Sequence, residues 1–392
     1  MPNIIRVGGG KVGNYNLQLK LPPTSEIVNL TSGRTYSFDV PEADFEGCKP
    51  AKSVSVGVNY SSSHEGLSGV NRDSSGAATI GDHAIFAGGS YINYSYTTNN
   101  SNLVDAYNKE LVRSSPEVLS NYVECAKATT IGNYALFSGS NVKSVDVYNK
   151  ELVHSTAEDR TGASFCAAAS VGNYALFSGN KKLVDVYNTE LIHSTMENQT
   201  VKSGCVATSV GEYALFGGGG SSTAKKVDAY NKELVRSAAP DLSLSEYQAS
   251  EYMSAVSTSD YALFGGGSNV DGNNDQYYYN NTVSAYNKEL IKSTTSLGGQ
   301  GREGIGTSSF KGGAIFTGGF FYDNSTDDEG YTIGTTYVHK ACFFNNELVM
   351  SAIDGSVDYP VGNEGNYMSG TEIGDYALIG CNKLNAYTLV KF

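Results

Sequence analysis

A short motif that recurs seven times constrains the fold of this 392-residue chain more than any other feature. In its clearest copy, Tyr213-Ala214-Leu215-Phe216 runs into four glycines, a pattern that predicts a strand followed by a tight turn. An alanine at the second position marks every copy: Ala84, Ala135, Ala175, Ala214, Ala262, Ala314 and Ala377. Each unit carries four strand-like segments, and repeats of about 40–50 residues with several strands each are typical of a β-propeller.

The composition supports an all-β fold and excludes several classes of function. The chain has 45 glycines, 28 tyrosines and eight prolines, which suits many turns between short strands. A net charge of -13 argues against nucleic acid or an anionic membrane as partner. No apolar run is long enough to insert into a membrane, and the first residues lack the apolar region of a secretory signal. The six cysteines form no CxxC pair, and we expect free, buried thiols rather than a disulfide.

Residues 1–49 do not match the repeat, and residues 50–392 form the seven units. We expect residues 1–49 to be an attachment segment with a small hairpin that turns at Ser32-Gly33. The seventh unit lacks the Asn-Lys-Glu turn of the others. An N-terminal strand near 52–62 is therefore expected to close the last blade, although Leu389–Phe392 turning back is the alternative.

The repeat resembles a known family. The segments Val171–Phe177, Val184–Asn188 and Leu152–Ser155 are similar to kelch-like repeats of structural and tail-associated proteins of Gram-positive bacteriophages, over residues 52–392. The kelch tryptophan is absent, and a leucine such as Leu152 or Leu234 stands nearby. The resemblance implies a seven-bladed kelch-like propeller with a short N-terminal β extension. It also implies a non-catalytic binding or structural component of a phage particle, such as a tail fibre, receptor-binding or decoration protein.

The histidines are better explained as structural than as catalytic residues. If Tyr148 faces Leu152 across the turn, Asp146 faces His154, and Asp185 faces His193 by the same arithmetic. Such opposite cross-strand charges stabilise a sheet by about 0.2–1 kcal/mol each. No HxH, HExxH or Cys/His cluster occurs, so we expect no metal, no cofactor, no catalytic residues and no enzymatic activity.

Two acidic, asparagine-rich loops, Asp271–Asp275 and Asp323–Glu329, could hold Ca²⁺, but solvated loops are the simpler interpretation. The long loops belong to units one, five and six, which lie in one sector of a closed ring. Tyrosine with Ser, Gly and Asn is typical of adaptable binding surfaces. The predicted binding residues are Tyr91, Tyr94, Tyr96, Tyr277, Tyr278, Tyr279, Phe320, Phe321 and Tyr322.

The predicted partners are other virion proteins, through residues 1–49, and a host cell-surface glycan or protein, through the loops. We expect no nucleic acid and no membrane insertion, and a homo-oligomer is open. The expected location is the virion, after synthesis in the host cytoplasm. Two alternatives stay open: a carbohydrate-active or oxidising propeller enzyme with an axial site, and an intracellular bacterial scaffold.

Overall fold

The chain folds into seven four-stranded antiparallel sheets, and the prediction of an all-β seven-bladed propeller is confirmed. The computed structural model describes residues 18–20, 27–29, 56–64, 66–69, 72–92, 98–163, 167–179, 183–197, 200, 204–219, 224–244, 252–271, 276–326, 332–338, 340–353, 367–380 and 384–391. None of these residues belongs to a helix that is long and apolar enough to cross a membrane.

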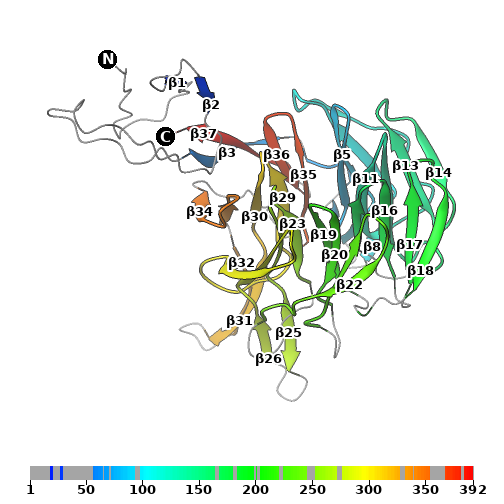
Figure 1. Cartoon of the computed structure of the whole chain (residues 1–392). Helices are drawn as coiled ribbons and strands as arrows, with labels where there is room; N and C mark the ends of the chain where they lie inside the picture. Colours follow the sequence, from blue (N-terminus) through cyan, green and yellow to red (C-terminus); the bar gives the residue numbers. More distant parts are fainter. Residues whose placement is uncertain are drawn as a thin grey trace.

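In each of the first four blades, the four strands of the repeat follow one another in chain order from the axis outward (Figure 1). Blade one consists of β5 (Gly76–Ile80), β6 (His83–Ala87), β9 (Val104–Tyr107) and β10 (Arg113–Ser114). Blade two consists of β11 (Glu124–Ile131), β12 (Tyr134–Ser140), β13 (Val145–Asn149) and β14 (His154–Ala157). Blade three consists of β15 (Ala168–Val171), β16 (Tyr174–Ser178), β17 (Leu183–Asn188) and β18 (His193–Glu197). Blade four consists of β19 (Val206–Val210), β20 (Tyr213–Gly217), β21 (Val227–Asn231) and β22 (Arg236–Ala239).

The last three blades follow the same order, except that the outermost strand of blade seven comes from the N-terminal side of the chain. Blade five consists of β23 (Ser254–Ser257), β24 (Tyr261–Gly265), β27 (Thr282–Asn287) and β28 (Lys292–Ser296). Blade six consists of β29 (Gly306–Phe310), β30 (Gly313–Thr317), β33 (Ala341–Phe344) and β34 (Met350–Ile353). Blade seven consists of β35 (Ser369–Ile373), β36 (Tyr376–Gly380), β37 (Leu384–Lys391) and β3 (Val56–His64).

Small sheets leave the blades at one end of the ring, where the second strands end. Two of them are hairpins, formed by β25 (Ser268–Asp271) with β26 (Gln276–Tyr279) and by β31 (Phe320–Thr326) with β32 (Thr332–Tyr337). Both hairpins extend from the same end of the molecule (Figure 1). A three-stranded sheet joins β4 (Arg72–Asp73), β7 (Ser90–Ile92) and β8 (Thr98–Asn100) at blade one. We call this end the loop face and the opposite end, with the short hairpin turns, the turn face.

Strand β3 is the outermost strand of blade seven, where it pairs with β37 from Val56↔Lys391 to His64↔Leu384. The ring is thereby joined by two strands from opposite ends of the sequence. Near the axis, the Ser75 and Ser369 hydroxyls of blades one and seven lie 2.9 Å apart. Further toward the N-terminus, β1 (Gln18–Lys20) pairs with β2 (Ile27–Asn29), and the expected turn at Ser32-Gly33 lies outside the described residues.

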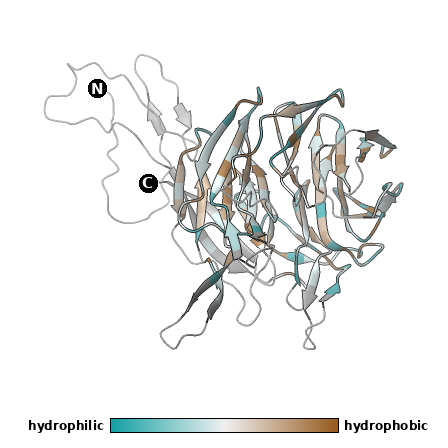
Figure 2. Ribbon diagram, turned by 90° about the horizontal axis from the view of Figure 1, so that it is seen from below, coloured by the Kyte–Doolittle hydropathy of each residue, from teal (hydrophilic) through white to brown (hydrophobic). Residues whose placement is uncertain are grey.

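The recurring motif buries one aromatic pair in each of blades one to six. In blade two, the rings of Phe137 and Tyr148 meet edge to face at 5.8 Å, and five other blades repeat this pair. The Tyr148 hydroxyl donates to the Glu117 carbonyl, 2.7 Å away in the preceding crossover. Edge-to-face pairs stabilise beyond their buried area, so this pair packs these six blades without a tryptophan. Hydrophobic residues lie along the strands of the blades (Figure 2).

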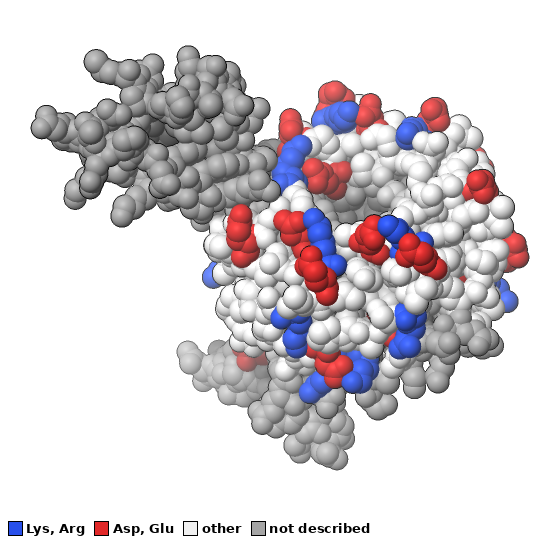
Figure 3. All heavy atoms as spheres, viewed as in Figure 1, with Lys and Arg blue, Asp and Glu red and all other residues white. Residues whose placement is uncertain are grey.

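The turn face is regular because its turns pack against one another around the ring. Gly81 in blade one has φ of 56°, and a Cβ placed there would lie 3.2 Å from the Lys150 side chain of blade two. Gly374 in blade seven meets Lys109 of blade one in the same way. Exposed ion pairs such as Lys288–Asp260, at 2.7 Å, accompany these contacts. Acidic and basic side chains accordingly lie mixed over the surface seen in Figure 3.

Candidate functional site

A narrow axial channel runs between the innermost strands of the seven blades. Its cavity has a volume of about 380 Å³ and is lined by small side chains, mostly alanine, serine and threonine. Among the described residues that line it, Glu372 alone is charged, and burial raises its pKa. The Lys311 backbone N–H donates to this carboxylate at 3.1 Å. A channel with these walls can hold water or a slender group, but it carries few groups for chemistry.

More polar, charged and aromatic side chains gather at the mouth of the channel on the loop face. A second cavity of about 180 Å³ at this end is lined by Ser75, Lys127, Met253 and Met368, among others. The chain enters the inner strands here. In the sequence of each blade, the residue ten positions before the motif alanine marks this entry: Ser74, Cys125, Phe165, Gly204, Tyr252, Gly304 and Tyr367. We call this set the mouth ring.

The mouth ring has an unusual backbone conformation. All six of its members that the structure describes have positive φ, between 46° and 77°; Phe165 is outside the described residues. This left-handed conformation costs a residue with a Cβ roughly 1–2 kcal/mol, and glycine adopts it freely. Four of these six described residues nevertheless carry a side chain. Backbone strain of this kind is enriched at binding and catalytic sites.

Aromatic rings collect around Tyr367 at the mouth. The Tyr252 ring lies 5.3 Å from it, and the Phe320 ring meets it edge to face at 6.0 Å. Gly304 makes this possible, because a Cβ there would lie 2.7 Å from Phe320. Burial raises the pKa of Tyr367, and the charges of Glu303 and Asp73 add to the effect. The Tyr367 phenol therefore stays protonated and can donate a hydrogen bond.

Asp73 is a titratable group at the mouth whose pKa is shifted toward neutral pH. Burial raises the pKa of its carboxyl to about 6, although the Ser90 hydroxyl donates to it at 3.0 Å. Glu303 occupies the same repeat position in blade six and accepts from the Ser268 hydroxyl. Both carboxylates act on the pKa of Tyr367, so blades six and one place an acid on either side of blade seven.

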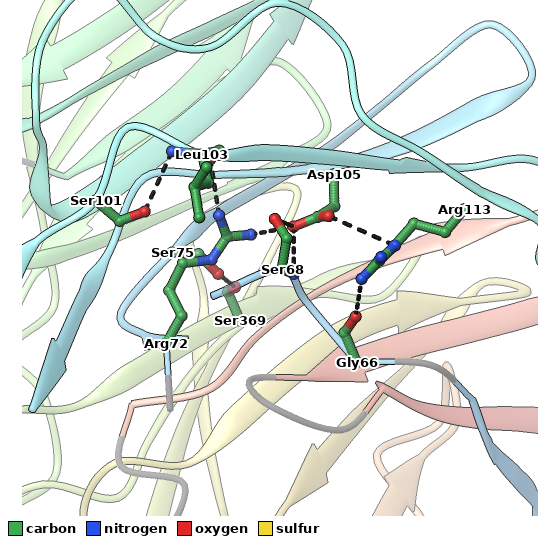
Figure 4. A network of polar contacts seen from close by, with 9 residues as sticks. All are labelled: Gly66, Ser68, Arg72, Ser75, Ser101, Leu103, Asp105, Arg113 and Ser369. Atoms are coloured by element: carbon green, nitrogen blue, oxygen red, sulfur yellow. Dashed lines mark hydrogen bonds and ion pairs between the residues drawn. The ribbon is translucent and has the colours of Figure 1, made fainter. Parts of the chain in front are cut away.

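A buried network holds the Asp73 strand in place (Figure 4). Arg72 is fully buried and donates to the Asp105 carboxylate at 2.5 Å and to the Leu103 carbonyl at 2.8 Å. Asp105 also accepts from the Ser68 backbone N–H at 2.9 Å. The strand that carries Asp73 is therefore tied to the body of blade one, which preorganises the carboxyl two residues before Ser75 of the channel mouth.

Cys125 of the mouth ring is half-buried, and burial raises the pKa of its thiol. A thiol with a raised pKa is a poor nucleophile at neutral pH. Cys205 and Cys342 are buried thiols outside any disulfide, as the sequence predicted, and Cys48, Cys166 and Cys381 lie outside the described residues.

A second aromatic cluster joins the two long hairpins. The rings of Tyr277 and Tyr279 are 6.3 Å apart and nearly parallel, at 13°. Tyr277 also meets Tyr322 of the neighbouring hairpin at 5.5 Å, and Tyr279 meets Phe321 at 6.2 Å. The Tyr322 backbone N–H donates to the Tyr279 hydroxyl at 2.8 Å. Four of the residues that the sequence predicted for binding thus form one surface, which we call the hairpin platform.

The other predicted binding residues lie elsewhere. Phe320 belongs to the mouth cluster and also meets Tyr337 at 6.0 Å. Tyr278 is on β26 opposite Asn269 of β25, and Tyr91 is on β7 opposite Arg72 of β4. Tyr94 and Tyr96 lie outside the described residues. The sequence did not point to Asp73, Tyr252, Glu303 or Tyr367, because each is a single residue in a different repeat.

The histidines contact the expected aspartates, but the predicted strand register is wrong. His154 lies opposite Tyr148, and Asp146 lies opposite Thr156. Leu152 takes φ of 61° inside the turn, so the strand begins two residues later than expected. The His154 Nε2 still reaches the Asp146 carboxylate diagonally at 2.8 Å, and His193 reaches Asp185 at 2.9 Å. Both aspartates also bind the preceding crossover, through Ser120 and Thr161, and are structural.

The described part of the chain contains no group of three or more His, Cys, Asp or Glu residues that could hold a metal ion. Of the two acidic loops proposed for Ca²⁺, residues 272–275 and 327–329 are not among the described residues.

Comparison with known proteins finds a shared fold. No protein-family model matches the chain, and no curated protein sequence matches it. A virginiamycin B lyase from Staphylococcus aureus is similar in structure, with a TM-score of 0.51 and 10% identity over 86% of this chain and 99% of the lyase. A streptogramin B lyase is similar with a TM-score of 0.53 and 12% identity over 85% and 98%.

A third similar structure is a catalytically inactive histidine-to-alanine variant of the S. aureus lyase with quinupristin, with a TM-score of 0.53 and 10% identity over 85% of this chain and 99% of the lyase. Identities this low show the fold alone. Neither the kelch resemblance nor a place in a phage particle is tested by these structures, and both stay predictions.

The prediction that the chain is not an enzyme is contradicted, because the three propellers of similar fold compared above are structures of lyases. The prediction relied on short motifs such as HExxH. An axial site in a propeller is assembled from one residue per blade, so its residues are spread over the whole sequence and leave no local motif.

Proposed function

We propose that the chain is a propeller enzyme that hydrolyses a glycosidic bond at the loop-face mouth of its axial channel. The observation that carries the proposal is the pair of acids, Asp73 and Glu303, on either side of Tyr367. Most glycoside hydrolases use two carboxyl groups that flank the scissile bond. The lyases of similar fold support a catalytic role for a propeller of this size, but their substrate is not carried over.

In this proposal Asp73 is the general acid. Its protonated carboxyl donates a proton to the glycosidic oxygen, and the carbon–oxygen bond breaks with its electron pair on that oxygen. Glu303 accepts a proton from the attacking water, so that the products are a new reducing end and a hydroxyl. Tyr367 hydrogen bonds to a sugar hydroxyl, and Tyr252 packs against the sugar ring.

The test is release of reducing ends from a panel of soluble neutral and anionic polysaccharides. We expect Asp73→Asn and Glu303→Gln each to lower kcat/KM by at least about 100-fold, the usual size of an acid–base contribution. Asp73 must be protonated to act, and burial raises its pKa to about 6. The kcat/KM of the wild type should therefore fall as pH rises through about 6.

The matched control is Glu117→Gln, which changes an exposed carboxylate in the first crossover and should leave activity unchanged. Wild-type protein that releases no reducing ends from any member of the panel contradicts the proposal. So does an Asp73→Asn variant with full activity and an unchanged pH profile.

A role in a phage particle is the second candidate, and it rests on the repeat resemblance. One observation favours it: β3 begins at Val56, paired with Lys391 at the end of β37 on the turn face. Residues 1–55 therefore join the propeller at the end opposite the long hairpins. In such a particle, the N-terminal segment would attach to other virion proteins and the loop face would meet a host cell-surface glycan or protein.

A further inference from the structure

We infer that the hairpin platform is a binding surface for neutral glycans and holds the part of a polysaccharide that extends beyond the mouth. The inference depends on the proposed function only for the statement that the bound polysaccharide continues into the mouth. The platform itself consists of Tyr277, Tyr279, Phe321 and Tyr322 from two adjacent blades.

The platform is preorganised. Tyr279 joins the two hairpins, since its hydroxyl accepts the Tyr322 backbone N–H and its ring contacts both Tyr277 and Phe321. Burial raises the pKa of Tyr279 to about 12, so this hydroxyl keeps its proton. Rigid aromatic groups lose little conformational entropy on binding, which raises affinity for a given contact area.

The platform is also accessible where a ligand would need it. Tyr277 is 40% exposed and Tyr322 is 37% exposed, whereas the corresponding Phe–Tyr pairs of the blades are fully buried. The C–H-rich face of a pyranose packs on a flat aromatic ring, and the tyrosine hydroxyl can bind the sugar's own hydroxyls. A chain of net charge -13 disfavours a polyanion, so the chemistry favours a neutral glycan.

The platform is continuous with the mouth along β31. Phe320 contacts Tyr367 of the mouth ring, and its neighbours Phe321 and Tyr322 belong to the platform. Glu303 and Phe320 are also paired through their backbones, at 3.0 Å in both directions. A polysaccharide that lies on the platform therefore reaches the site of the proposed acids within one strand.

The experiment is native gel electrophoresis of the full chain through gels that contain xylan, galactomannan, β-glucan, soluble starch or polygalacturonate. We expect at least one neutral polysaccharide to retard the wild type. Tyr277→Ala and Tyr322→Ala should each raise its dissociation constant about tenfold, as loss of an aromatic anchor does. Tyr277→Phe should bind nearly as well as wild type.

The control is Tyr122→Ala, which removes a tyrosine that is 66% exposed in the crossover between blades one and two, and it should bind like wild type. The inference is overturned if no neutral polysaccharide retards the wild type, if only polygalacturonate does, or if the platform variants bind normally. Asp73→Asn should keep its retardation while losing turnover. An active Asp73→Asn variant would therefore refute the proposed hydrolysis and leave glycan binding intact.

Discussion

At the residue scale, the mouth ring shows a conflict between stability and function. Gly204 and Gly304 adopt the left-handed conformation without cost, and Ser74, Cys125, Tyr252 and Tyr367 adopt it at a cost. Tyr252 is 52% exposed, so burial of its ring offsets little of that cost. The side chain is best explained by what it contacts at the mouth.

This strain can be measured with two substitutions at one position. Tyr252→Ala and Tyr252→Gly both remove the ring, but only glycine relieves the left-handed conformation, with φ of 53°. We expect the free energy of unfolding to be about 1 kcal/mol higher for the glycine variant than for the alanine variant. Chemical denaturation of both proteins measures the difference. An alanine variant as stable as the glycine variant would show that the position is unstrained.

The mouth ring could not be predicted from the motifs, because its members differ chemically while their neighbours repeat. Aligning the seven units on the motif alanine places Ser74, Cys125, Tyr252 and Tyr367 in one column. The residue type at this position varies from unit to unit, whereas the neighbouring positions repeat. The raised pKa of Asp73 could not be predicted from the sequence either, because it arises from burial in the folded propeller.

At the element scale, one turn explains both the success and the error of the predicted register. The Asn149 side chain accepts from the backbone N–H groups of Glu151 and Val153, at 3.0 and 2.9 Å. This conformation places Leu152 in the left-handed region, which no simple alternation of strand residues anticipates. The predicted Asp–His contacts still form, because long side chains in a sheet can reach their diagonal neighbours.

The long segments of units five and six were predicted as binding loops, and the structure contains paired strands within them. Their tyrosines, threonines and phenylalanines favour strands. The strand pairing was not predicted, because acidic and asparagine-rich segments are typical of loops and lie between the paired strands. The aromatic contacts between the two hairpins depend on neighbouring blades and could not be derived from either hairpin alone.

Strand β3 is the element whose removal should be most damaging. Deleting residues 1–64 exposes the edge of β37 along its length and removes all of the pairs from Val56↔Lys391 to His64↔Leu384. We expect the free energy of unfolding to fall by at least about 3 kcal/mol. Deleting residues 1–49 leaves the whole strand and should hardly change it. Thermal and urea unfolding compare the two truncations, and equal stability would contradict this role of β3.

At the scale of the whole molecule, the fold was predictable because the same contacts are made seven times. A single motif alanine is fully buried in every blade: Ala84, Ala135, Ala175, Ala214, Ala262, Ala314 and Ala377. A strand that is hard to recognise in one unit can therefore be assigned from the equivalent strands of the other units. The candidate site has the opposite property, since its residues come from the places where the blades differ.

The ring should tolerate new chain ends. Val56 and Lys391 are paired neighbours, so a short glycine-rich linker can join them, and the exposed turn at Lys150-Glu151 can be opened instead. We expect this circular permutant to keep the circular dichroism spectrum of the parent lacking residues 1–55. Its melting temperature should lie within a few degrees of that parent, because all blade contacts are retained. A permutant that does not fold would show that β3 must enter the ring first.

The pairing of β3 with β37 also determines how the molecule carries mechanical load. A pull on the chain ahead of Val56, resisted at the loop face, acts along β3 rather than across it. The hydrogen bonds to β37 are then loaded together, in shear, instead of parting one after another as in an unzipping sheet. Beyond His64 the tension enters blade one, whose crossover is tied by Ser68 to the buried Asp105–Arg72 pair. The seam of the ring is thus the part of the propeller placed to bear traction.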